Sequence, residues 1–483
     1  MIQKLILYMQ KKNFIKKKFK NIIIGTGISA LGCAYTLLKN KEEFIIIEAS
    51  QNRLFKPKKK LILDNNFTPI KYNLISHLDI LKKKVFGGNS LIWGANCLRM
   101  RKPQFKNWPI KYNDLEKFYE EAEKLLEICH FQDQISKHFK IKKFKNINRK
   151  LYDSFIISRL NNIKKIDANL LIGFARLALS SDCYACMKCF YGCKDNYIYN
   201  SKKWFENNLN INIDIKFGLE LDYFKNEQKL IKLFFKKNTI NYYCDNLYLC
   251  AGTLSTTQIV LNSHEKKTEL NIKESQLFVI PCFFLDKKIE SKKIQTLSQL
   301  QIYFKKYQNI YLEFKHDPDL IRQILKKKLL LLYYFIPKFI YKKIYIITGF
   351  LPDSYSSDYL QFTNYNKSSL IQWKKKTNFL EKKIIKKRIL DIIYLISKKL
   401  DFKYFSFLLN IYNRGRSYHL GSSIPMQTLS SKKYIYTHIN GALNFNQNVF
   451  ICDSSNFPNL PSSSIGLTIL ANAMRIAEKK NSQ

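Results

Sequence analysis

One segment near the N-terminus constrains the fold more than any other part of the chain. Residues 20–50 read KNIIIGTGISALGCAYTLLKNKEEFIIIEAS. Apolar runs predict strands at 22–24 and 44–47, and the apolar spacing over 31–38 predicts a helix between them. A glycine-containing turn connects the first strand to the helix. Strand, tight turn, helix and strand in this order are typical of the βαβ unit that binds dinucleotides.

The residues of the turn match the physical needs of that unit. Gly25 permits a sharp turn, and Gly27 has no side chain, so the backbone can approach a pyrophosphate. Ala30, in place of a third glycine, still lets helix and strand pack closely. The helix begins near Ile28, where unpaired N–H groups can bind phosphate. Glu48, about 20 residues further on, can accept hydrogen bonds from a ribose. A βαβ unit without ligand is the alternative.

Glycine is scarce, which makes the remaining glycines informative. The chain has 15 Gly in 483 residues, whereas about 7% is usual. Lys, Asn, Ile, Phe and Tyr are abundant, and these are the amino acids of AT-rich codons. We therefore expect the remaining glycines to lie where no other residue fits.

The chain carries a formal net charge of +45, nearly all of it from lysine. The lysines are spread along the sequence in short runs, and arginine, the usual residue for phosphate and base recognition, is rare. No zinc-finger, RNP-like or helix-turn-helix motif is present. We therefore expect a solvated lysine surface and no specific nucleic-acid partner. Peripheral contact with anionic membranes is the alternative.

Length and cysteine content indicate the class of protein and its compartment. The length allows two or three domains. No stretch approaches the roughly 18 consecutive apolar residues of a transmembrane helix, and the first 20 residues lack the cleavage site of a secretory signal. Eleven cysteines, an odd number, then indicate mostly free thiols in a reducing compartment. We expect a cytoplasmic protein, or one that is peripheral to a membrane.

Two further segments predict contacts with a dinucleotide. Residues 85–100 read VFGGNSLIWGANCLRM, with a turn that can bring backbone amides against a phosphate or a ring system. That turn consists of Gly87, Gly88, Asn89 and Ser90. Residues 107–128 follow, and they predict a helix that Asn113 or Asp114 can cap. Residues 246–263, NLYLCAGTLSTTQIVLNS, predict a strand and a helix around Gly252, a second point of close backbone approach.

The C-terminal part holds two more motifs, YHLGSSIPM at 418–426 and NVFICDSSNFPNLPSSSIGLTILANAMRIAE at 448–478. With the segments above, they resemble the glucose–methanol–choline (GMC) family of flavin oxidoreductases. Members of that family have a GG-S-xx-W-G loop and a WP-x-x-Y helix after the first FAD motif. The matching segments cover the front third of the chain and the last seventy residues. The chain looks most similar to a bacterial branch often encoded among surface-polysaccharide genes.

The resemblance implies FAD as the cofactor and assigns roles to several residues. His419 would be the base, because a neutral imidazole with a pKa near ~6.5 can take a hydroxyl proton. Asp453 and Ser454 would hold the ribityl–pyrophosphate region. The last helix, starting near Leu467, would point its positive end at the isoalloxazine. The resemblance thus implies cofactor contacts from Gly25, Gly27, Ile28, Ala30, Glu48, Gly87, Gly88, Asn89, Ser90, Gly252, Asp453, Ser454 and Ile465.

One position departs from the family pattern. Most members carry a second His or Asn about three residues after the proline of the last motif. Here Ser464 follows Pro461 at that position, and a serine hydroxyl can only form a weaker hydrogen bond. The departure leaves His419 without its usual partner and puts the substrate in doubt.

The predicted fold class is α/β, or α+β overall: an FAD-binding Rossmann-like domain with a second, antiparallel-sheet substrate domain. A basic arm, 1–19, precedes the two parts of the FAD domain, 20–264 and 411–483. Alternating segments such as QLQIYFKKY, NIYLEF and DYLQF predict the antiparallel sheet within 265–410. Residues 326–346 mix basic and apolar side chains and predict amphipathic helices, with a membrane-interface segment as the alternative.

A run of four cysteines forms a separate motif within residues 181–194. Cys183, Cys186, Cys189 and Cys193 have the spacing of ferredoxin-type iron–sulfur runs, although Lys194 stands where such runs carry proline. No second run is present. An iron–sulfur cluster, a zinc ion and a loop of buried or reactive thiols all remain open at this point.

The sequence therefore predicts an FAD-dependent oxidation of a CH–OH group, with a sugar, a lipid-linked sugar or another small alcohol as substrate. Hydride would pass to flavin N5, with His419 as base and Ser464 beside it. We expect a dehydrogenase rather than an oxidase. The alternative is an FAD-binding electron-transfer or non-catalytic protein, since Ser464 and the cysteine run depart from ordinary alcohol chemistry.

Overall fold

The computed structural model describes residues 17–51, 84–129, 131–141, 151–163, 170–189, 193–209, 213–266, 268–287, 295–304, 310–318, 321–322, 326, 334–355, 358–365, 368–374, 379–412, 417–427 and 434–479. Most of the basic arm predicted at 1–19 lies outside these residues. Its last residues belong to the first strand, β1 (Lys17–Ile24).

The first domain is built on a sheet whose central strands are parallel. The order of these strands is β19-β7-β1-β2-β4. Their bounds are β2 (Phe44–Glu48), β4 (Asp214–Phe217), β7 (Asn238–Leu249) and β19 (Asn446–Ile451). The antiparallel strands β5 (Leu221–Glu227), β6 (Leu230–Phe235) and β18 (Ala442–Leu443) extend it. The apolar end of β1 and the whole of β2 are buried, as expected for strands covered on both faces.

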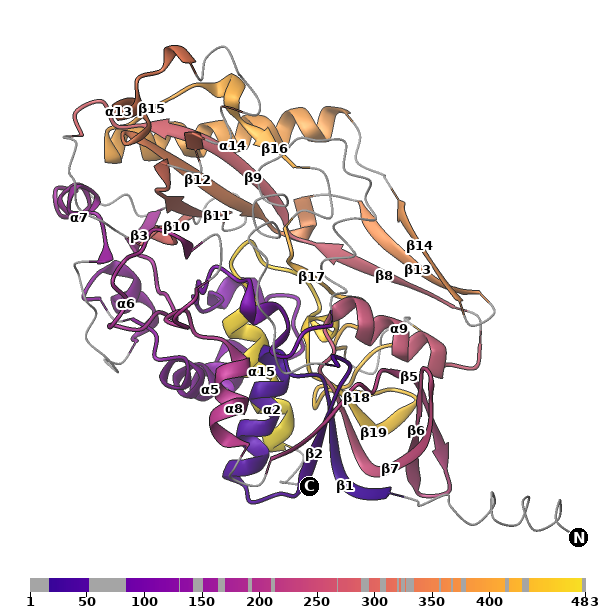
Figure 1. The fold of residues 1–483 in the computed structure, drawn as a ribbon. Coiled ribbons are helices and arrows are strands. Elements are labelled where there is room, and N and C mark those ends of the chain that lie inside the picture. Colours follow the sequence, from indigo (N-terminus) through magenta and orange to yellow (C-terminus); the bar gives the residue numbers. More distant parts are fainter. Residues whose placement is uncertain are drawn as a thin grey trace, which may run out of the picture.

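Helices cover both faces of this sheet (Figure 1). On one face α2 (Ile28–Lys39) packs against α15 (Gly466–Lys479), which also contacts α5 (Tyr112–Leu125). The other face carries α9 (Thr253–Ser263) and the β5–β6 hairpin. Alternate residues of β1 serve the two sides: Ile23 joins the cluster around α2, whereas Ile22 and Ile24 join the cluster around α9. Shorter helices are α6 (Gln134–Phe139), α7 (Ser154–Asn161) and α8 (Ser201–Asn208).

The second domain consists of antiparallel sheets. The larger sheet has the order β15-β9-β12-β11-β10-β3, with β16 also pairing with β9. Its strands are β3 (Leu170–Phe174), β9 (Gln276–Phe283), β10 (Ser298–Phe304), β11 (Ile310–Lys315), β12 (Ile344–Leu351), β15 (Lys403–Tyr404) and β16 (Asn410–Ile411). The smaller sheet, β14-β13-β8-β17, uses β8 (Glu269–Glu274), β13 (Tyr359–Tyr365), β14 (Ser368–Lys374) and β17 (Leu420–Gly421). The predicted antiparallel sheet is therefore confirmed. Two of its strands, β3 and β17, come from outside residues 265–410.

The larger sheet separates a helix from the domain that contains the parallel sheet. Burial alternates along β9, and its inward residues, such as Phe278 and Ile280, join the apolar cluster that contains Ile389 and Ile393 of α14 (Phe379–Leu400). α14 therefore covers one face of the sheet, as Figure 1 shows, and the opposite face is free to line a site.

The segment predicted to be amphipathic, 326–346, is described in part. It contains α13 (Lys338–Tyr341) and the beginning of β12, and residues 327–333 lie outside the described residues. Among the helices that the structure describes, none is both long and apolar enough to cross a membrane.

Candidate active site

A cavity of about 760 Å³ lies between the parallel sheet and the larger antiparallel sheet. Residues at the carboxyl ends of β1, β2, β7 and β19 line it, and so does one face of β9, β11 and β12. Ligands of open α/β sheets bind at the carboxyl ends of the strands. The position of the cavity is therefore that of a dinucleotide site with a second chamber under the antiparallel sheet.

The glycines of the first turn occupy two different environments. Gly25 has φ +101° and donates its N–H to Ile47 O at 2.8 Å, and a Cβ there would lie 2.7 Å from Cys250 O. Gly27 has an ordinary φ of −73°, and a Cβ there would meet no atom within 4 Å. Gly25 is thus required by the protein's own backbone, whereas Gly27 leaves open space on the cavity side.

Three helices begin at the wall of this cavity. α2 starts after Gly27 and α9 after Gly252, and neither glycine has a side chain that could cap its helix, although the Asp453 carboxylate interacts with the Gly252 N–H at the start of α9. α15 starts at Gly466, one residue before the predicted Leu467. Uncapped first-turn N–H groups and the helix dipole favour an anion. The cavity therefore offers several positive helix ends to a phosphorylated ligand.

Glu48 lies at the end of β2 and is 4% exposed. Its carboxylate accepts hydrogen bonds from Thr26 Oγ1 at 2.5 Å and from the Ser50 N–H at 2.8 Å. Burial raises its pKa, and these hydrogen bonds oppose the rise. Thr26 in turn accepts the Gly87 N–H at 2.9 Å. The acid is thus held at the cavity wall and linked to the second glycine turn.

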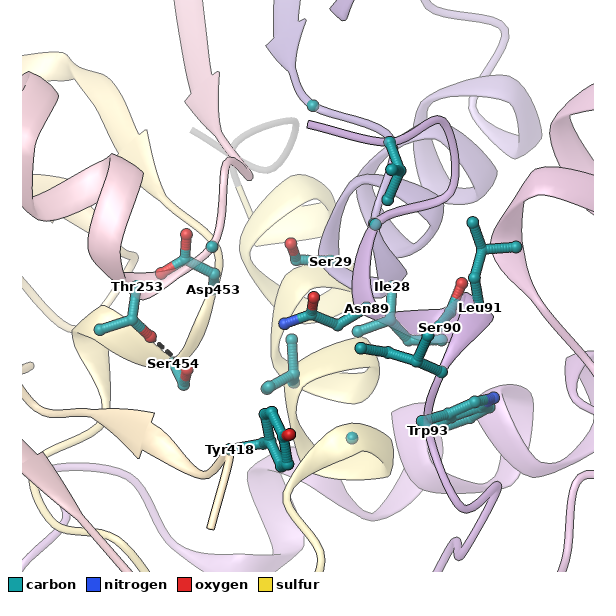
Figure 2. A pocket seen from close by; sticks show the side chains of 18 of the residues that line it. Ile28, Ser29, Asn89, Ser90, Leu91, Trp93, Thr253, Tyr418, Asp453 and Ser454 are labelled. Carbon is teal, nitrogen blue, oxygen red and sulfur yellow. Dashed lines mark hydrogen bonds between the residues drawn. The ribbon is translucent and has the colours of Figure 1, made fainter. Parts of the chain in front are cut away.

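The second turn leads into the 3₁₀ helix η1 (Gly88–Leu91). Gly87 and Gly88 have φ +97° and +56°, a region that favours glycine. Ser90 Oγ donates to Gly87 O at 2.6 Å and pairs with Ser201 Oγ at 2.7 Å, so its hydroxyl braces the turn. Figure 2 shows the Asn89 side chain extending from η1 toward the side of the cavity that carries Asp453.

Asp453 and Ser454 lie on the opposite wall, directly after β19. The buried Asp453 carboxylate accepts hydrogen bonds from Thr256 Oγ1, at 2.5 Å, and from the N–H and hydroxyl of Ser455. Burial raises the pKa of Asp453. Ser454 Oγ donates to Leu420 O at 2.7 Å and shares a hydrogen bond with Thr253 (Figure 2). These side chains fasten β19, the first turn of α9 and β17 to one another.

His419 lies immediately before β17 and faces the same cavity. Its ring packs against Phe350 of β12, with ring centroids 4.4 Å apart, and its buried Nδ1 has no hydrogen-bond partner among the residues that the structure describes. Burial lowers the pKa of His419 to about 4; Glu313 opposes this decrease and Lys315 adds to it. The imidazole is therefore neutral at neutral pH, which is the state that a general base requires.

Ser464 and Ile465 line the cavity just before α15, so the structure brings them into the same chamber as His419. Ser464 is half-buried, and Ile465 is buried. Behind them, a Cβ at Gly466 would lie 3.0 Å from the Trp93 ring. The Trp93 indole N–H donates to Tyr199 O at 2.8 Å. The beginning of α15 is therefore fixed against the loop that follows η1.

Sequence reasoning missed the wall that the antiparallel sheet contributes. This wall carries Glu313 and Lys315 on β11, Thr348 and Phe350 on β12, and Leu277 and Val279 on β9. Glu313 faces Thr348 across the strands, and its carboxylate forms an ion pair with Lys315 at 3.0 Å and accepts a hydrogen bond from Asn96. Thr348 Oγ1 is buried and has no hydrogen-bond partner within the described part of the chain. The sequence feature that could have identified this wall is Glu313, a charged residue within the apolar strand pattern NIYLEFK.

The cysteine run borders the cavity but does not form a preassembled metal site. Cys189 and Cys193 line the cavity, and the Tyr197 N–H donates to Cys193 Sγ at 3.2 Å. In the described part of the chain, the one cysteine group close enough to hold a metal is Cys33, Cys250 and Cys452. These three sulfurs lie within 4.8 Å of one another. Sequence reasoning did not single them out, because they are far apart along the chain.

A scan against protein-family models and a search of curated proteins found no match. Solved structures do match over nearly their whole length. Pyridoxine 4-oxidase from Mesorbium loti has a TM-score of 0.61 and 11% identity, with 96% of this chain and 99% of that chain covered. A formate oxidase variant from Aspergillus oryzae RIB40, studied for FAD modification, has a TM-score of 0.62 and 10% identity, with 96% and 98% covered. At this identity the likeness concerns the fold, and it confirms the predicted class: a Rossmann-like α/β domain joined to an antiparallel-sheet domain.

Proposed function

We propose that this protein is an FAD-dependent oxidoreductase of the GMC type that oxidises a CH–OH group. The observation that carries the proposal is the arrangement of one cavity. Its dinucleotide end has the open space beside Gly27 at the start of α2, and its other chamber has the neutral His419. The similarity in fold to pyridoxine 4-oxidase and formate oxidase supports the same reading.

The residues present fit FAD. Gly27 leaves room where a side chain would block a pyrophosphate, and the uncapped start of α2 supplies N–H groups for it. Glu48 keeps acceptor capacity for a ribose beside its hydrogen bonds to Thr26 and Ser50. The first turn of α15 would lie near the flavin ring, where its positive end stabilises the anion of the reduced ring.

The catalytic residues act on the substrate's hydroxyl group. His419 accepts the hydroxyl proton, and packing against Phe350 limits the orientations of its ring. Ser464 hydrogen-bonds the same oxygen from the α15 side. FAD, when bound, supplies the hydride acceptor. The antiparallel sheet forms the wall of this chamber opposite the nucleotide-binding end and so covers one side of the reacting groups.

The substrate class follows from the wall that faces His419. Glu313 and Lys315 neutralise each other, and Thr348 offers an unpaired hydroxyl. The neighbouring Leu277 and Val279 are apolar. A neutral molecule with several hydroxyl groups and one apolar face matches these groups, as a sugar or lipid-linked sugar would. A carboxylate would meet Glu313 and is disfavoured.

The test begins with the absorbance spectrum of the purified protein and its flavin content. We expect stoichiometric FAD that is bleached anaerobically by a sugar alcohol from a panel of neutral polyols. His419→Ala should retain FAD but be reduced about 10²–10⁴-fold more slowly, the usual contribution of a general base. His264→Ala, outside the cavity, is the matched control. Equal reduction rates for His419→Ala and the wild type would show that His419 is structural.

The second candidate function is electron transfer, favoured by the position of Cys189 and Cys193 at the cavity. In this version Cys183, Cys186, Cys189 and Cys193 would hold an iron–sulfur cluster, although they are not assembled as a metal site in the part of the chain that the structure describes. The cluster would supply a one-electron acceptor, and the enzyme would then be a dehydrogenase. The Tyr197 N–H donates to Cys193 Sγ, a kind of hydrogen bond that also occurs at the sulfurs of iron–sulfur clusters. Both similar structures are named oxidases, so the acceptor needs its own measurement.

Anaerobically purified protein should then contain iron and acid-labile sulfide in similar amounts. Cys186→Ser should remove both and leave FAD in place, because the FAD motifs lie elsewhere. Cys244→Ser, in a strand of the parallel sheet, is the matched control. Protein with full FAD but neither iron nor sulfide would show that the cysteine run is a loop of thiols without a cluster. Oxygen would then be the candidate electron acceptor.

A further inference from the structure

The first two turns of α14 expose large apolar side chains. Phe379 is 79% exposed, Leu380 67% and Ile384 51%. Single exposed apolar residues are ordinary on protein surfaces, but a group of three on adjacent turns is not. The same surface continues to Tyr394 and Leu395, further along α14, which are 53% and 38% exposed.

Four lysines lie on these same turns: Lys382, Lys383, Lys386 and Lys387. All four are exposed, and none forms an ion pair with any residue that the structure describes. Two of the pairs, 382/386 and 383/387, have the i, i+4 spacing at which like charges repel. The charges also lie near the positive end of the helix dipole. Glu381 in the first turn and Asp391 carry the opposite charge on the same helix, so the first three turns keep a net positive charge that favours an anionic partner.

The helix cannot hide this surface by rotating. Its opposite side is anchored in the core through Ile385, Ile389 and Ile393. Because α14 covers the face of the large sheet away from the cavity, the exposed side points away from the candidate active site (Figure 1). A partner can therefore bind there without closing the substrate chamber.

We propose that the exposed face of α14, centred on Phe379–Lys387, docks on an anionic lipid bilayer. The lysines pair with acidic headgroups while Phe379, Leu380 and Ile384 enter the headgroup–acyl boundary. A nucleic acid would leave these aliphatic groups unused, and arginine rather than lysine is the usual reader of phosphate geometry. A symmetric contact with a second copy would place the two lysine clusters against each other.

The test is co-sedimentation of the full-length, FAD-containing protein with vesicles. Binding should be strong to vesicles that contain phosphatidylserine and weak to pure phosphatidylcholine, and high salt should release the protein. Replacing Lys383 and Lys387 by Gln should lower the partition coefficient about 30-fold, since each lysine near an acidic surface contributes about five-fold. Replacing Lys229 and Lys237 by Gln, an equal change of charge in the exposed β5–β6 and β6–β7 turns, should have little effect.

A separate variant tests the contribution of the apolar side chains to vesicle binding. Phe379→Ser with Leu380→Ser should reduce binding to acidic vesicles, whereas Tyr184→Ser, another exposed aromatic, should not. The proposal is overturned if both lipid compositions bind equally or if the lysine variant binds like its control. It is also overturned if an oligonucleotide displaces the vesicles, or if the Phe379/Leu380 variant abolishes a dimer of the wild type.

Discussion

At the residue scale, Gly25 and Gly27 are required for different reasons: Gly25 by the backbone conformation, and Gly27 by the proposed ligand. The two glycines are two positions apart in one turn, and the sequence motif requires glycine at both positions. Gly25 has a backbone conformation that side chains rarely adopt and no room for a Cβ beside Cys250 O. Gly27 satisfies neither condition. No contact within the described residues therefore requires a glycine at position 27, and in the proposed function the requirement comes from the cofactor.

We expect Gly27→Val to abolish FAD retention while leaving the free energy of unfolding of the FAD-free protein nearly unchanged. Gly25→Ala should instead destabilise the protein by at least about 1–2 kcal/mol, because of its positive φ and the contact with Cys250 O. Flavin content and urea denaturation of the FAD-free proteins measure the two effects. A yellow Gly27→Val variant with full FAD would contradict the assignment of the cavity.

At the scale of elements, buried ion pairs join segments that have no strand pairing between them. Arg99 donates two hydrogen bonds to Glu123 of α5, at 2.7 and 2.6 Å, and both side chains are almost fully buried. Arg99 also donates to Phe139 O at the end of α6. Burial raises the pKa of Glu123, and the guanidinium opposes this rise. This charged contact thus adds to the packing of α5 against α15 in fixing the position of α5.

Replacing one member of the Arg99–Glu123 pair should lower the free energy of unfolding more than replacing both members. We expect Glu123→Leu alone to lower the free energy of unfolding by about 3–5 kcal/mol, since Arg99 would be left buried without its partner. Adding Arg99→Met should recover part of that loss. Urea denaturation of both single variants and the double variant measures the coupling. If the double variant loses the full sum of the two single losses, the pair is not coupled as the structure indicates.

At the scale of the whole molecule, buried histidines connect stability to pH. His316 lies under β12, with its ring stacked 4.4 Å from Tyr345 and its Nε2 3.0 Å from Lys342 O. Burial lowers its pKa to about 3; Lys287 adds to this decrease and Asp153 opposes it. Its ordinary pKa is 6.5. Between these values the unfolded chain binds more protons than the folded one, so acid destabilises the fold.

The contribution of the buried neutral histidines to the free energy of unfolding should therefore be at its full value well above pH 6.5 and should decrease as the pH is lowered. His316 accounts for about 2 kcal/mol of the loss between pH 7 and pH 5. His419 adds a loss of the same sign, because its pKa is also lowered. His316→Phe should show a smaller difference in urea denaturation between these two pH values than the wild type, whereas His264→Ala should keep the full difference. An unchanged difference in His316→Phe would show that His316 does not titrate as described.

The sequence alone determined the elements whose signals are local. The strand, turn and helix of residues 20–48 are contiguous, and the start of α15 was placed within one residue of Gly466. Strands of the antiparallel sheet were readable because their side chains alternate every second residue. Asn113 or Asp114 was expected to be the N-cap of the helix within 107–128, which is wrong: the N-cap residue is Lys111, and Asp114 is the third helical residue, whose side chain accepts the Lys111 N–H.

The tertiary structure decided which side chains share the cavity. Glu313, Thr348 and Val279 meet because β11, β12 and β9 pair in one register, and a slip of one residue would turn all three to the other face. Ser90, predicted from the sequence to contact the cofactor, uses its hydroxyl to brace a turn through a partner over a hundred residues away. The lysines of α14 can be recognised as part of one exposed surface only when the structure shows that the other face of the helix is buried. Local patterns fix elements, whereas strand pairing and burial, which join distant residues, fix sites.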